Sequence, residues 1–195
     1  MNAHKLCVKF FLQDPAALHG VAMVPVFQSW IQMQSAEGHL LIDVADYDHV
    51  PDGPGTVLVS HEANFATDSI GGRPGLLYQR KQPIDGAATM AARWTAVLRH
   101  ALAAAERLEA YPGLKFRTEE LLVRVADRLL APNTAETFAA VRPELEEALG
   151  GLLGASTFEL THHADPRKMF EVAVRATAAP SVSELLARTA APVGV

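Results

Sequence analysis

KLCVKFFL, at residues 5–12, has an apolar side chain at every second position, and both of its lysines fall on the positions between them. A period of two is typical of a β-strand that turns one face toward the core and the other toward solvent. We therefore predict a half-buried strand with Lys5 and Lys9 on its exposed face. Its buried face is predicted to consist of Leu6, Val8, Phe10 and Leu12.

A second segment, at 121–129, repeats this pattern and decides the fold. Four residues of the first segment have similar residues at one constant distance along the chain. The two sets are Leu6, Val8, Leu12 and Pro15, and Val123, Val125, Leu129 and Pro132. After a slip of one residue, Pro25, Phe27, Ile31, Leu40 and Ile42 match Pro143, Leu145, Leu149, Phe158 and Leu160. We infer an internal duplication. It favours a strand at 121–129, although this segment also has helical spacing.

Strands and helices alternate along the rest of the chain. Helices are predicted at 19–35 and 87–110, and after Asn133, where Glu136 completes a capping box and Gly150-Gly151 ends the helix. Pro25 either kinks the first helix or lies in its first turn. Turns are predicted at 51–55 and 71–75. The further strands are predicted at 40–45, 56–66, 76–81, 114–116, 158–162 and 170–174.

These elements predict an α+β fold in which duplicated βαββ units form an antiparallel or mixed sheet packed against helices. A single domain is predicted over residues 1–178, with pseudo-repeats at about 4–82 and 121–177 joined by the helix at 87–110. Residues 179–195 are predicted to form a C-terminal tail with a short helix, capped through Ser181 and Glu184, and a frayed end. Two such units leave room for a groove between them, at an approximate twofold axis.

Composition argues against several classes of protein. The formal net charge is −5 and the basic residues are scattered, so no nucleic-acid partner is expected. Cys7 is the single cysteine and provides neither a disulfide framework nor a cysteine-based zinc site. No apolar run is long enough to span a bilayer and no signal peptide is recognisable. We therefore expect no membrane partner and a cytoplasmic location.

The stretch LLIDVADYDHVPDGPG, residues 40–55, raises the question of a metal-binding loop because it carries four aspartates and a histidine. Its spacing departs from the EF-hand template, since Val50 and Pro51 fall where a ligand and the sharp glycine should be. Solvated loop aspartates beside a hairpin turn are the favoured interpretation. Asp43 is the exception. It interrupts an apolar strand and must point to water or into a groove.

The histidines do not form a recognisable metal site. His61 shares a predicted strand face with Val57 and Val59, which favours a hydrogen-bonded core residue, and Glu62 then points to the opposite face. A metal site would have to combine His61 or His162 with His49 and an aspartate, and nothing in the spacing requires this. No metal and no cofactor are therefore predicted.

The architecture resembles that of known ligand-binding proteins. Two strand-helix-strand-strand modules in tandem resemble the GyrI-like small-molecule-binding domains and, less closely, the paired modules of vicinal oxygen chelate proteins. The segments LLIDVADYDHVPDGPG, VLVSHEANFATD and GRPGLLYQRK are similar to an uncharacterised family of bacterial proteins. This second resemblance implies no activity and no site residues, and an architecture alone does not fix a function.

Two classes of function fit these observations. The favoured one is a non-catalytic small-molecule-binding or regulatory module with a groove between the βαββ halves. Its polar lining is predicted to include Asp43, Glu62, Tyr78 and Arg80, with His61 as a further candidate. The alternative is an enzyme in which His49, His61 or His162 works with a carboxylate as an acid-base group or metal ligand. The alanines of 87–110 also permit close packing against a partner helix, which is compatible with a homodimer.

Overall fold

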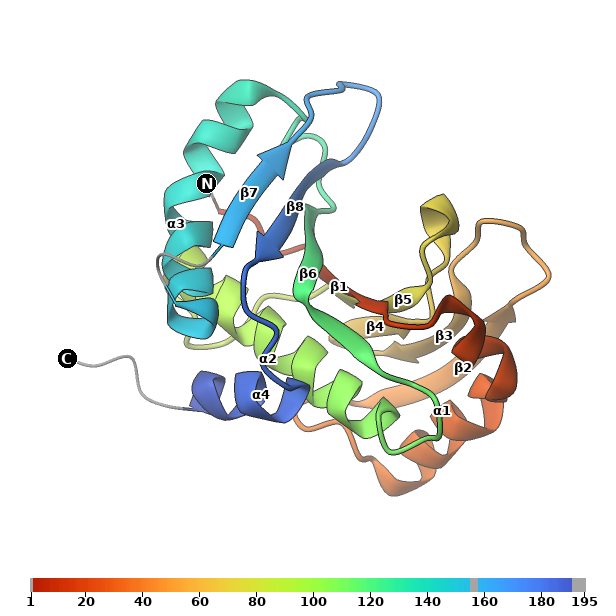
Figure 1. Cartoon of the computed structure of the whole chain (residues 1–195). Helices are drawn as coiled ribbons and strands as arrows, with labels where there is room; N and C mark the ends of the chain where they lie inside the picture. The colour runs from red at the N-terminus through yellow and green to blue at the C-terminus, as the bar shows by residue number, and fades with distance from the viewer. Residues whose placement is uncertain (1, 155–157, 191–195) are drawn as a thin grey trace.

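The computed structural model describes residues 2–154 and 158–190, and its centre is an eight-stranded antiparallel sheet (Figure 1). The order of strands across the sheet is β2-β3-β4-β5-β1-β6-β8-β7. The strands are β1 (Leu6–Leu12), β2 (Leu41–Tyr47), β3 (Gly55–Ser60), β4 (Ala63–Ala66), β5 (Gly75–Arg80), β6 (Phe116–Val125), β7 (Phe158–His162) and β8 (Phe170–Ala176). The α-helices are α1 (Met23–Met33), α2 (Met90–Leu108), α3 (Ala135–Leu153) and α4 (Val182–Ala190), and 3₁₀ turns occur at Pro15–Gly20 and Ile70–Gly72.

The α-helices gather on one side of the curved sheet, which confirms the α+β class (Figure 1). Helix α2 crosses the middle of that side and contacts β1 and β5 as well as α3 and α4. Its buried stripe recurs at helical spacing and includes Trp94, Leu98, Ala101, Leu102 and Ala105. Val182 and Leu185 of α4 belong to the same hydrophobic core, so the short C-terminal helix packs onto α2. The predicted frayed end at 191–195 lies outside the described residues.

The two segments that decide the fold lie side by side at the centre of the sheet. β1 pairs antiparallel with β6, and Leu6 and Val8 stand opposite Val125 and Val123. Residues 121–125 are therefore a strand, as the repeat predicted. Leu129, however, was predicted to face inward and is 96% exposed, because β6 ends at Val125 and the chain turns at Asp127. The internal duplication itself stays a prediction.

The segment 56–66 was predicted as one strand, and this is wrong. The chain reverses between β3 and β4, and the Ser60 hydroxyl closes the reversal by donating to the Ala63 carbonyl and accepting from its N–H. His61 and Glu62 therefore lie in a turn. His61 is exposed rather than buried beside Val57 and Val59.

Lys9 was predicted to lie on an exposed face, and this is also wrong. All seven residues of β1 are buried, and Lys9 is only 2% exposed. Its ammonium group lies 2.5 Å from a carboxylate oxygen of Asp68, which follows β4. The reason is tertiary packing on this face of the sheet, where Asp68 lies against Lys9, and the Lys9 ammonium and the Arg73 guanidinium both lie over the Phe11 ring.

The predicted starts of three helices, α1, α3 and α4, lie in the described residues. Helix α3 begins after Thr134, whose hydroxyl accepts from the Thr137 N–H, so Thr134 rather than Asn133 is the N-cap. The cap at Ser181 is confirmed, since its hydroxyl accepts from the Glu184 N–H and the Glu184 carboxylate accepts from the Ser181 N–H. Pro25 lies in the first turn of α1. No helix within the described residues is long and apolar enough to cross a membrane.

Candidate functional site

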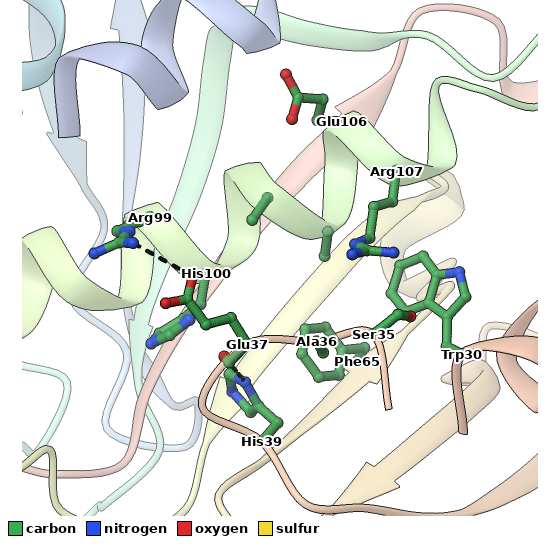
Figure 2. Close-up of a pocket in the computed structure, with 12 residues that line it drawn as sticks. Trp30, Ser35, Ala36, Glu37, His39, Phe65, Arg99, His100, Glu106 and Arg107 are labelled. Atoms are coloured by element: carbon green, nitrogen blue, oxygen red, sulfur yellow. Dashed lines mark hydrogen bonds and ion pairs between the residues drawn. The ribbon is translucent and has the colours of Figure 1, made fainter. Parts of the chain in front are cut away.

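A cavity of about 290 Å³ lies between α2 and the connection from α1 to β2 (Figure 2). Its apolar wall comes from Trp30, Phe65 and the small side chains Ala103 and Ala104 of α2. Ligand cavities typically measure about 300–1,000 Å³, so this one suits a small molecule or part of a larger one. It lies beside the first half of the chain and α2, whereas the sequence predicted a groove between the two halves.

The floor of this cavity is a chain of hydrogen bonds that begins at His39. The ring Nδ1 of His39 lies 2.8 Å from the Glu37 carbonyl oxygen, so Nδ1–H donates to it. Nε2 is then the acceptor for the hydroxyl of Tyr78, at 2.9 Å. Burial lowers the pKa of His39, and it raises the pKa of Tyr78 to about 12. Both side chains are therefore neutral at pH 7, and each has its polar atoms satisfied by the other or by the backbone.

His100 of α2 completes an aromatic cluster with these two residues. Its ring stacks on Tyr78 at a centroid distance of 5.8 Å and meets His39 edge to face at 4.6 Å. Burial, followed by the positive electrostatic influence of His39, Arg80 and Arg99, lowers the pKa of His100 to about 4. Within the part of the chain that the structure describes, no hydrogen bond engages the His100 ring. It therefore offers a ligand one N–H donor and one nitrogen acceptor without carrying charge.

Two further polar groups line the cavity, the buried Ser35 hydroxyl and the exposed guanidinium of Arg107. The Ser35 hydroxyl is buried without a hydrogen bond. The guanidinium of Arg107 lies over the Trp30 ring at 5.9 Å, and among residues 2–154 and 158–190 it has no carboxylate within ion-pair distance. Figure 2 shows Arg107 pointing toward Trp30 and Ser35, whereas Glu106 points away from them. A buried hydroxyl without a partner costs free energy, and a bound polar group would recover it.

An exposed ion pair crosses the mouth of the cavity. Arg99 of α2 and Glu37 of the α1–β2 connection approach to 3.5 Å, and their side chains are 50% and 88% exposed. Exposed pairs of this kind contribute little to stability. The mouth is therefore held by a weak contact that a ligand can displace.

Two of the predicted site residues lie at this cluster. Tyr78 is completely buried and provides the hydroxyl described above. Arg80 is 7% exposed and uses its guanidinium to hold the chain after β5, donating to the carbonyls of Gln82 and Pro83. Its charge also contributes to the lowered pKa of both histidines. Arg80 therefore acts on the site electrostatically and does not line the cavity.

The other three predicted residues have different surroundings. The carboxylate of Glu62 accepts from the Leu40 N–H at 2.8 Å and joins the β3–β4 turn to the start of β2. The pKa of Glu62 is lowered from its ordinary value: burial raises it, but hydrogen bonds from the Leu40 and Glu62 N–H groups and the nearby His39 and His61 outweigh this effect. His61 is exposed next to Glu62. Asp43 is exposed on β2 and accepts from the Val44 N–H, so it faces water.

The histidines considered for an enzyme are not brought together. His49 is exposed in the β2–β3 turn, and His162 donates through Nε2 to the Asn133 side chain at 2.7 Å while stacking on Phe138. Within the described ranges, no group of three or more histidine, cysteine, aspartate or glutamate side chains is placed to hold a metal ion.

Sequence reasoning missed the residues that make this site, namely Ser35, His39, His100 and Arg107. A partial signal was present, because His100, Ala103, Ala104 and Arg107 recur on one face of the central helix. His39 and Ser35 lie in a short irregular connection, where periodicity carries no information.

Comparison of the chain with protein-family models, with curated proteins and with solved structures found no match. The resemblances to GyrI-like domains and to a bacterial family therefore stay predictions, and the case for a function depends on the geometry of the site.

Proposed function

We propose that this protein is a small-molecule-binding module whose cavity takes a small organic anion with an apolar or aromatic body. The observation that carries the proposal is that two groups line the same cavity beside an aromatic wall. They are the Arg107 guanidinium, which is exposed and has no ion pair among the described residues, and the Ser35 hydroxyl, which is buried without a partner. Ligand cavities typically combine such walls with a few polar groups that orient the ligand.

An anion is favoured by the balance of charge around the cavity. Glu37 is engaged by Arg99, and Glu106 points away, so Arg107 is the charge left without a partner at the apolar wall (Figure 2). His39 and His100 are neutral at pH 7 because burial lowers the pKa of each ring. A carboxylate would pair with the guanidinium and accept from Ser35, and such charge-assisted hydrogen bonds are about twice as strong as neutral ones.

Binding is favoured over acid-base catalysis. An efficient general base has a pKa near the working pH. The pKa of His100, at about 4, makes it a weak base at pH 7, and the acceptor nitrogen of His39 is occupied by Tyr78. The enzyme alternative would need a bound substrate to change these protonation states.

The test uses phenylacetate and its uncharged counterpart phenylacetamide as probes, measured by isothermal titration calorimetry. We expect phenylacetate to bind at least tenfold more tightly than phenylacetamide, and Arg107→Gln to remove that preference. Arg167→Gln is the matched control, because this side chain is 95% exposed in the β7–β8 turn. Equal affinity for acid and amide, or unchanged binding by Arg107→Gln, would refute the proposal.

A further inference from the structure

A second and larger cavity, of about 840 Å³, lies between α2, α3 and α4. We call it the helical groove. Most of its wall is apolar and formed by small side chains, including Ala92 and Ala96 of α2 and Ala148 and Gly151 of α3. Its charged groups are Arg99, Glu147 and Arg188, and the last of these donates to the Leu152 carbonyl.

The helical groove and the cavity described above share Arg99 and His100 as wall residues. Both cavities are lined by one stripe of side chains along α2. These side chains recur every three or four residues, so they lie on a single face of the helix. At 1.5 Å per residue, this stripe extends about 22 Å from one end to the other. Its members are Ala92, Ala96, Arg99, Ala103 and Arg107.

The stripe is polar at one end and apolar at the other. Its C-terminal end presents Arg107, in the cavity that Ser35 of the α1–β2 connection also lines. Its N-terminal end presents Ala92 and Ala96, opposite Ala148 and Gly151 of α3. His100 lies where the two cavities meet and is uncharged, so an apolar chain can pass on its side of the junction without desolvating an ion. Arg99, at the same junction, is charged, but its side chain is half exposed and keeps its contact with water.

Building on the proposed function, we propose that the natural ligand class is a long-chain carboxylate, with its head at Arg107 and its acyl chain lying past His100 in the helical groove. The unpaired cation at one end distinguishes this occupant from a helix of a second copy, which would leave Arg107 and Ser35 without partners. In the helical groove, Arg188 donates to the Leu152 carbonyl, Arg99 pairs with Glu37, and Glu147 disfavours a second carboxylate. The ligand is therefore expected to have one charged end.

The test is a chain-length series of hexanoate, decanoate and tetradecanoate, titrated below their micellar concentrations. Full burial of one methylene corresponds to about a fourfold gain in affinity. We expect tetradecanoate to bind at least tenfold more tightly than decanoate, because only the longer chain extends beyond His100 to Ala96. Ala96→Leu, which partly fills the groove, should remove this gain and leave phenylacetate binding unchanged. Ala139→Leu, at an exposed position of α3, is the matched control.

The outcomes separate the two proposals. If phenylacetate binds through Arg107 but affinity does not rise with chain length, the acyl-chain inference is refuted and the proposed function stands. If neither phenylacetate nor decanoate binds, the proposed function fails as well. Decanoate binding that Arg107→Gln leaves unchanged would refute the head-group assignment. A dimer in light scattering that Ala96→Leu dissociates would show that the groove is a self-association surface, which also overturns the inference.

Discussion

The ammonium group of Lys9 lies inside the protein, and its partner is the equally buried carboxylate of Asp68. Burial lowers the pKa of Lys9, the contact with Asp68 opposes this, and the charges of Arg124 and Arg73 lower the pKa further. The second oxygen of Asp68 has no hydrogen bond. Such a pair is costly to desolvate, so it is weak evidence for stability, whereas removal of one partner leaves an isolated buried charge.

At the scale of the residue, we predict that Lys9→Met lowers the free energy of unfolding by about 3 kcal/mol, because Asp68 is left buried and unpaired. The double variant Lys9→Met with Asp68→Leu should recover most of this loss. Urea denaturation of the single and double variants measures both values. Arg142→Met, which removes an exposed pair with Glu146, is the control and should change stability by no more than about 0.5 kcal/mol. A double variant as unstable as Lys9→Met would contradict the explanation.

At the scale of the element, the β2–β3 hairpin carries the four aspartates that raised the question of a metal loop. Residues 41–47 form β2, the prolines and glycines of 51–55 make the turn, and β3 returns antiparallel, as predicted. Asp46, Asp48 and Asp52 are all exposed, also as predicted. They differ in their contacts, however. Asp52 has φ of 57° and accepts from the Gly71 and Gly72 N–H groups, so it ties the hairpin to the loop before β5.

We predict that Asp52→Ala destabilises the protein by about 1–2 kcal/mol, because it removes these acceptors and places alanine at a positive φ that aspartate tolerates better. Asp48→Asn should change stability by no more than about 0.5 kcal/mol, since its contact with the Thr56 hydroxyl is long, at 3.5 Å. Thermal unfolding of the two variants tests the difference. If calcium or manganese raised the melting temperature and Asp48→Asn abolished that response, the interpretation of this loop as structural would be wrong.

At the scale of the whole molecule, β1 joins the two halves because it pairs with β5 of the first half and β6 of the second. The edge strands β2 and β7 each pair with one neighbour, β3 and β8 respectively. The halves therefore share their central ladder and the helix α2, and we expect them to unfold together.

Amide hydrogen exchange tests this expectation. The amides of β1 and β6 should exchange at least tenfold more slowly than those of β2 and β7, because opening the centre of the sheet requires global unfolding whereas edges open locally. Protection of similar size in β1 and β7, or two separate unfolding steps for the halves, would show that the central pair does not couple them.

The sequence by itself determined the α+β class, the strand at 121–125, the β2–β3 hairpin, the long central helix and the cap at Ser181. Most of these depend on local information, since alternation, helical spacing and turn residues act over a few neighbouring positions. The strand at 121–125 also required its likeness to residues 5–12, because its own spacing fits a helix as well. Only the tertiary structure decided that Lys9 is buried, because its partner lies 59 residues away along the chain. The candidate site was likewise decided by the tertiary structure. Ser35, His39, Tyr78, His100 and Arg107 come from three separate elements or connections, and they meet because α2 packs across the sheet beside the α1–β2 connection.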